Sequence, residues 1–100
     1  MTDTRRLFCI FADAIPRGHT QVADGVACKL VLFKMALSDE DARRSLAGIL
    51  YGGGWASWTF ESGGEVEGEA YADADPAIVE AMSLARRDGQ AMVIYPATRN

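Results

Sequence analysis

Cysteine, histidine and proline are scarce in this chain of 100 residues. The two cysteines, Cys9 and Cys28, are too few for a disulfide-stapled scaffold, so we expect reduced thiols and a cytoplasmic location. The single histidine, His19, excludes a metal site built from several histidines. No apolar run reaches the roughly 18 residues of a membrane-spanning helix, so we expect no membrane insertion.

Basic residues are also few, and they are unevenly placed. The net charge is −4, and residues 61–100 contain three basic residues against eight acidic ones. Nucleic-acid binding depends largely on Lys and Arg that contact phosphates, so we expect no nucleic-acid partner. The hydrophobic content of 49% is enough for a core, and the length predicts a single domain over residues 1–100.

The clearest structural signals lie in residues 26–55. Residues 26–37 carry apolar side chains at both even and odd positions, which predicts an interior strand covered at least in part on both faces. Ser38 is a good helix N-cap, and three acidic residues follow it at the positive end of the helix. The glycine run 52–54 ends this helix, whereas a phosphate loop would precede one. The predicted apolar face of the helix consists of Ala42, Leu46, Ile49 and Leu50.

The strands at the two ends of the chain follow from the same patterns. Residues 5–12 are apolar at both parities and predict the first strand, and residues 91–95 predict a short buried last strand. Residues 13–25 admit several interpretations. Gln21 to Asp24 form a helical turn, an extension of a hairpin arm, or a loop that makes the first two strands an antiparallel hairpin with a long connection.

Two alternating segments follow the glycine run. Residues 55–61 and 65–72 have the two-residue period of half-buried strands. Ser62-Gly63-Gly64 lies between them and predicts a tight turn, so we expect a hairpin.

A second helix is predicted after Asp75, which is an N-cap followed by proline, and Gly89 ends it. Two helices among four or five strands predict an α+β two-layer sandwich, with a mainly antiparallel sheet and both helices on one face. The number and rhythm of the elements resemble a ferredoxin-like arrangement, although no family motif accompanies this resemblance. A short or missing helix between the first two strands departs from that pattern.

Five residues are candidates for a binding site. Glu65, Glu67 and Glu69 share one face of the predicted acidic strand, where they either protect an edge from aggregation or attract a basic partner. Trp58 could line a ligand pocket, although such residues more often belong to the core. His19 could act as a general base, but a solvated loop histidine is the commoner case. No residue is assigned a catalytic or metal-binding role, and no cofactor is expected.

Two functional hypotheses follow from these observations. In the first, this small acidic protein binds a macromolecular partner, either a basic protein or a second copy of itself as a homodimer. An immunity or antitoxin protein is the sharpest form of this hypothesis. In the second, the protein binds or converts a small molecule in a cleft between sheet and helices. The absence of a catalytic set favours the first hypothesis and argues against an enzyme.

Overall fold

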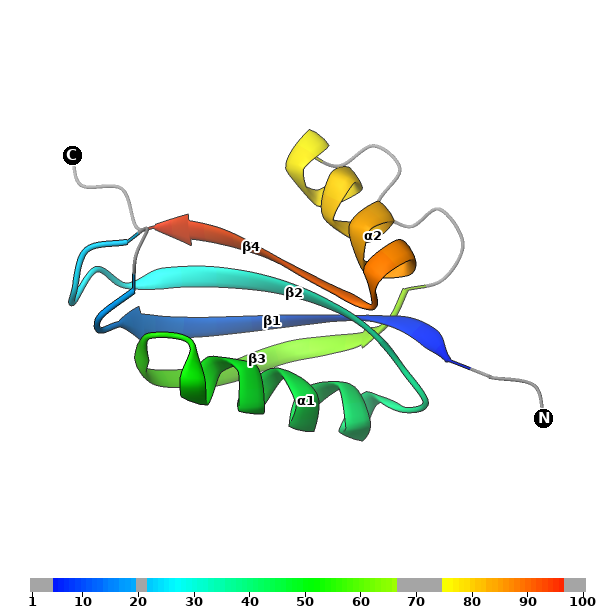
Figure 1. The fold of residues 1–100 in the computed structure, drawn as a ribbon, viewed down its shortest axis with the longest axis horizontal. Coiled ribbons are helices and arrows are strands. Elements are labelled where there is room, and N and C mark those ends of the chain that lie inside the picture. Colours follow the sequence, from blue (N-terminus) through cyan, green and yellow to red (C-terminus); the bar gives the residue numbers. More distant parts are fainter. Residues whose placement is uncertain (1–4, 20–21, 67–74, 97–100) are drawn as a thin grey trace.

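The computed structural model describes residues 5–19, 22–66 and 75–96, which form a four-stranded antiparallel sheet and two helices (Figure 1). The strand order is β3-β1-β2-β4, so β1 and β2 are the inner strands. This confirms the α+β fold class and the interior position predicted for the strand over residues 26–37. The elements in chain order are β1 (Arg6–Pro16), β2 (Cys28–Ala36), α1 (Asp39–Gly52), β3 (Trp55–Glu65), α2 (Pro76–Asp88) and β4 (Gln90–Pro96).

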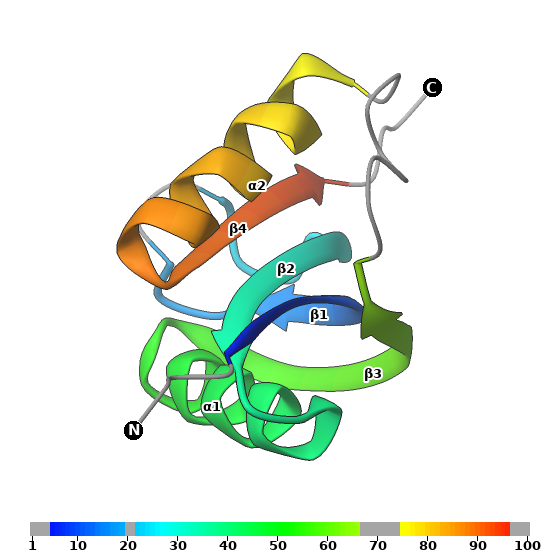
Figure 2. The ribbon, with the colours of Figure 1, turned by 90° about the vertical axis from the view of Figure 1, so that its right-hand side faces the viewer.

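The two helices lie on opposite faces of the sheet, which corrects the expectation of a shared face (Figures 1 and 2). Ile10 of β1 belongs to a buried cluster with Leu46 of α1. The adjacent residue, Cys9, belongs to a separate buried cluster with Met82 of α2. Successive side chains of a strand point to opposite faces, so the helices cover different sides. We call these sides the α1 face and the α2 face. Each helix and the strands beneath it form a two-layer α+β unit.

Both helices begin and end where the sequence predicts. The Ser38 hydroxyl accepts a hydrogen bond from the Asp41 amide at 3.1 Å, and the Asp75 carboxylate accepts one from the Ala77 amide at 3.0 Å. These caps satisfy amides that have no partner within the first turn. Gly89 follows α2 with a φ of 101°, a conformation that favours glycine. Neither helix, as far as the structure describes them, is long and apolar enough to cross a membrane.

Residues 13–16 extend β1, and the described residues 17–19 and 22–27 form no helix, which agrees with an antiparallel hairpin that has a long connection. β1 and β2 pair in antiparallel register, with Ile10 opposite Leu32. The Gly25 amide donates to the Pro16 carbonyl at 3.1 Å, and the Arg17 amide donates to the Gly54 carbonyl at 2.7 Å. The described part of the connection is therefore tied to the ends of β1 and α1.

The hairpin turn predicted at Ser62-Gly63-Gly64 is wrong, because β3 continues through these residues to Glu65. A Cβ atom on Gly63 would lie 2.6 Å from the carbonyl oxygen of Cys9 in β1. Gly63 is therefore needed for close contact between two strands, and neither it nor Gly64 has the positive φ typical of a tight turn. The second arm of the predicted hairpin lies mostly outside the described residues.

A β-bulge interrupts the pairing of β3 with β1. Phe11 is opposite Ser62 and Ala12 is opposite Phe60, so Glu61 is the extra residue. The bulge turns the side chain of Glu61 toward Lys29, which is 2.6 Å away on β2.

Candidate functional site

β4 is an edge strand, and among the described strands it pairs only with β2. The Met35 amide donates to the Gly89 carbonyl at 2.9 Å, just before the first paired residue of β4. Hydrogen-bonded positions alternate along an antiparallel ladder. The backbone N–H and C=O groups of Gln90, Met92 and Ile94 therefore point away from β2. We call these three the outward residues of β4.

Hollows flank β4 on both faces of the sheet. On the α1 face a hollow of about 230 Å³ is lined by Leu32, Leu46 and Met92, among others. It is left open because α1 lies toward β3, at the other edge of the sheet (Figure 1). On the α2 face a hollow of about 350 Å³ lies between residues 91–94 of β4 and one stripe of α2. That stripe consists of Ala77, Glu80, Ala81 and Leu84.

The two edges of the sheet differ in charge. β3 carries Glu61 and Glu65 and contains a bulge, which are features that discourage pairing with another strand. β4 has no charged residue from Gln90 to Tyr95, and its side chains there are mostly apolar. Pro96 closes this edge, because proline has no N–H to offer. The outward residues therefore form an uncharged strand edge with apolar space on either side.

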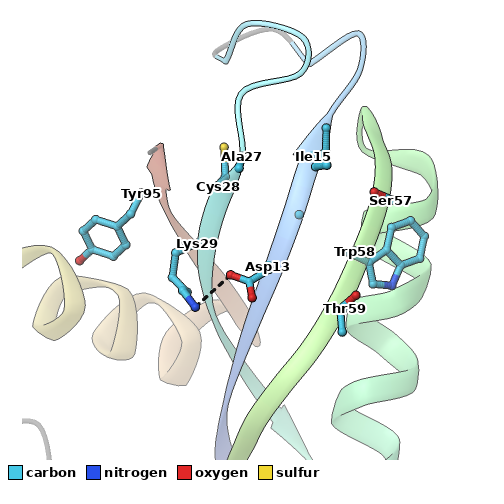
Figure 3. Close-up of a pocket in the computed structure, with 10 residues that line it drawn as sticks. Asp13, Ile15, Ala27, Cys28, Lys29, Ser57, Trp58, Thr59 and Tyr95 are labelled. Atoms are coloured by element: carbon cyan, nitrogen blue, oxygen red, sulfur yellow. Dashed lines mark ion pairs between the residues drawn. The ribbon is translucent and has the colours of Figure 1, made fainter. Parts of the chain in front are cut away.

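A further hollow, separate from the two beside β4, has a volume of about 370 Å³ (Figure 3). It lies where the end of β1 and the start of β2 adjoin β3. Lys29 and Asp13 are directly opposite each other on β2 and β1, and their charged atoms are 2.9 Å apart. The Lys29 ammonium also lies 2.6 Å from a carboxylate oxygen of Glu61. Three strands thus contribute to one exposed ion-pair cluster.

The contacts within this cluster stabilise the charged forms of Lys29 and Asp13. Hydrogen bonding with Glu61 and with Asp13 raises the pKa of Lys29. Hydrogen bonding with Glu61 and with Lys29 lowers the pKa of Asp13. Lys29 is therefore held as a cation and is not activated as a nucleophile or a base. The chemistry that the cluster supports is attraction between strands.

Tyr95 borders the same hollow near the start of α2. Its hydroxyl donates to the Asp75 carboxylate at 3.4 Å, and burial together with the Asp75 charge raises the pKa of Tyr95. Tyr95 is therefore a neutral hydroxyl at physiological pH. It links the end of β4 to the N-terminus of α2.

The sequence-predicted site residues do not converge. Trp58 borders the hollow, but its ring lies on the other side of β3 from Asp13 and Lys29 and packs against the core of the α1 face (Figure 3). His19 packs against Trp55, with ring centroids 4.9 Å apart. Glu65 is at the opposite end of β3 from Trp55 and pairs with Arg6 at 2.7 Å.

The predicted acidic row is described only at its first residue. Glu67 and Glu69 lie outside the described residues. The Arg6 guanidinium offsets the charge of Glu65, so this glutamate on its own is not a free anionic site.

Both cysteines are buried on the inner strands, and they form no disulfide with each other. The Cys28 thiol donates to the Val26 carbonyl at 3.3 Å, and burial raises the pKa of Cys28. A raised pKa opposes thiolate formation, so Cys28 is not an activated nucleophile. Among the described residues, no group of three His, Cys, Asp or Glu side chains is placed to hold a metal ion.

Sequence reasoning did not select the outward residues of β4 or the cluster of Lys29, Asp13 and Glu61. The strand predicted over residues 91–95 is confirmed, but it is an edge strand of intermediate burial and not a buried one. The cluster could not be predicted, because its three residues come together only through the register of three strands, and this register cannot be read from the sequence.

Comparison of the chain with protein-family models, with curated proteins and with solved structures finds no match in any of the three.

Proposed function

We propose that the protein acts by binding a macromolecular partner, and that the partner adds a strand to the outer edge of β4. The observation that carries this proposal is the set of outward backbone groups on Gln90, Met92 and Ile94, which no described strand satisfies. An added strand would form a backbone ladder with them, as in other cases of strand addition. The uncharged edge offers no repulsion to an approaching strand.

The two hollows provide the apolar part of this binding surface. Side chains of an added strand alternate between the two faces of the sheet. On one face they would contact Leu32 and Leu46, and on the other they would contact Ala81 and Leu84. The backbone ladder gives affinity, and the shape of the two hollows gives selectivity for side-chain size.

The charge of the chain supports a finer form of this proposal. The acidic excess in residues 61–100 would accelerate encounter with a basic protein, as expected for an immunity or antitoxin protein. The buried thiols favour a reducing compartment such as the cytoplasm. Steering of this kind weakens with salt, whereas the apolar contacts at β4 do not.

The alternative function, binding of a small molecule, would use the hollow beside Asp13 and Lys29. Its volume of about 370 Å³ is large enough for a small ligand. The charged groups there already satisfy one another, so a polar ligand would have to displace an existing ion pair. The β4 edge has no such competing interaction among the described residues, and for this reason we prefer strand addition.

A synthetic strand tests the proposal. A fluorescent peptide with the sequence of residues 89–96, extended by lysines for solubility, is titrated with the protein and followed by anisotropy. The control peptide carries N-methyl groups on two adjacent residues, which blocks both of its edges without changing its charge. We expect the first peptide to bind and the control to bind at least roughly tenfold more weakly, because the ladder cannot form.

Two protein variants locate the binding site. Ile94→Lys places a charge at an outward residue of β4, and Ala56→Lys places the same charge at an exposed position of β3. Binding should weaken in the first variant and remain in the second. Equal binding of both peptides, or equal binding by both variants, would contradict strand addition at β4.

A further inference from the structure

We infer that the strand added to β4 is the β4 of a second copy of this chain, in an antiparallel pairing centred on Met92; this rests on the proposed function of the β4 edge. A two-fold axis perpendicular to the sheet would relate the two copies. The result is one continuous eight-stranded sheet with a helix pair on each face.

The spacing of the outward residues makes this edge complementary to itself. Met92 is midway between Gln90 and Ile94, and all three have their backbone groups on the outer side. In the centred register Met92 lies opposite Met92 of the second copy, and Gln90 lies opposite Ile94. Each such pair exchanges two backbone hydrogen bonds, so every outward N–H and C=O group gains a partner. Shifting the register by one pair leaves an outward residue of each copy without one.

The proposed pairing of the two β4 strands is also limited at both ends by the supply of outward backbone N–H groups. The next outward position after Ile94 is Pro96, which has no N–H. In the other direction, the next outward position before Gln90 would be Asp88, which belongs to α2 and not to the strand. The self-complementary part of the edge is therefore limited to residues 90–94, which fixes the register.

Side chains on both faces suit a second copy. Met92 and Ile94 pack at the margin of the α1-face core, and those of the second copy would extend that core across the seam. On the α2 face, the stripe of Ala77, Glu80, Ala81 and Leu84 would come beside the same stripe of the second copy, so the Glu80 carboxylates add to the repulsion that salt must screen. Small residues allow two helices to approach to their usual separation of about 8–10 Å.

The charge pattern gives this dimer a distinctive salt dependence. Each copy has a net charge of −4, so two copies repel one another, while the residues from Gln90 to Tyr95 at the seam are uncharged. Salt screens the repulsion and leaves apolar contacts intact. Dimerisation should therefore strengthen between low and physiological salt, which is the opposite of the trend expected for a basic partner.

Sedimentation equilibrium on the full chain tests the inference. We expect the parent to show twice the chain mass of 10.8 kDa, with the dimer fraction rising with concentration and with salt. Ile94→Lys should raise the dimer dissociation constant by roughly tenfold or more, because an unpaired charge would be buried at the seam. Ala56→Lys, which adds the same charge on β3, should dimerise at least as well as the parent.

Cysteine cross-linking tests the register and does not depend on the fold of the lysine variant. In the centred register the two Met92 Cα atoms lie about 5.5 Å apart, within the range of a disulfide. Met92→Cys should therefore form a covalent dimer under mild oxidation. Val93→Cys should form a covalent dimer much more slowly. In the centred register the two copies of residue 93 are not opposite each other, and their side chains point to the other face of the sheet. The parent measures the background from its two buried cysteines.

The outcomes separate this inference from the proposed function. A monomeric parent that binds the strand peptide would overturn the homodimer and leave strand addition in place. A monomeric parent that does not bind the peptide would overturn both. A dimer that Ile94→Lys does not weaken, or that Met92→Cys does not cross-link, would use another surface and would also overturn the inference.

Discussion

The substitution Gly63→Ala examines the part of the fold that the sequence predicted least well. A Cβ atom at this position would lie 2.6 Å from the Cys9 carbonyl oxygen, 2.7 Å from Ile10 Cδ1 and 3.0 Å from Ile10 Cα. Two of these atoms belong to the backbone of an inner strand, so rotation of a side chain cannot relieve the contact. We expect the free energy of unfolding to fall by about 1–3 kcal/mol, the range found when added atoms force a backbone to shift.

Gly64→Ala is the matched control, because a Cβ atom there meets nothing within 4 Å. Neither glycine has a positive φ, so alanine is compatible with both backbones. Alanine also reduces the freedom of the unfolded chain, and we expect Gly64→Ala to be neutral or to stabilise by up to about 1 kcal/mol. Urea denaturation monitored by tryptophan fluorescence gives both values. Equal effects at the two positions would refute the continuous β3 strand and favour an exposed turn.

Three further predictions concern the core, the thiols and the ion-pair cluster. Leu46 lies on the buried face of α1 and is 1% exposed, so Leu46→Ala should lower the free energy of unfolding by about 2–5 kcal/mol in chemical denaturation, and a loss below about 1 kcal/mol would contradict the assigned core. Cys9 and Cys28 should both titrate as free thiols in freshly purified, denatured protein but react slowly in the native state, and finding no free thiol would contradict the expected redox state. The pKa of Asp13 is lowered from 3.8 in the folded state, so its carboxylate stabilises the fold above that pH and loses this contribution as the pH falls through the folded pKa. The stability difference between the parent and Asp13→Asn should therefore shrink on acidification. A difference that does not change with pH would refute the role of the pair with Lys29.

The helices could be predicted from the sequence because their signals are local. Ser38 and Asp75 cap the two helices within a few residues of where they act. Their apolar faces follow from a spacing of three and four residues, and Leu46 and Met82 are buried as that spacing requires.

The placement of the helices on opposite faces could also have been inferred. Residues of β1 and β2 are apolar at both parities, so each face of the inner strands needs a cover. With two helices available, one on each face is the arrangement that buries both Leu32 and Phe33. The expectation of a shared face followed from a common architecture and gave too little weight to this parity.

The glycines of β3 show why the hairpin prediction failed. Glycine is favoured both in tight turns and where two backbones approach closely. Only the packing of Gly63 against Cys9 distinguishes the two cases, and this contact joins residues that are far apart in the sequence. The open edge of β4 was missed for a related reason, because whether β4 is an inner or an edge strand depends on the order of the whole sheet.

Backbone amide exchange measured residue by residue tests the central claim, that the outer edge of β4 pairs with another strand. Val93 points its amide toward β2 and should be protected at every protein concentration. Met92 and Ile94 point theirs outward, so we expect fast exchange in dilute protein and protection that rises with concentration as copies pair. Fast exchange of Met92 and Ile94 at all concentrations, with and without the strand peptide, would contradict the account.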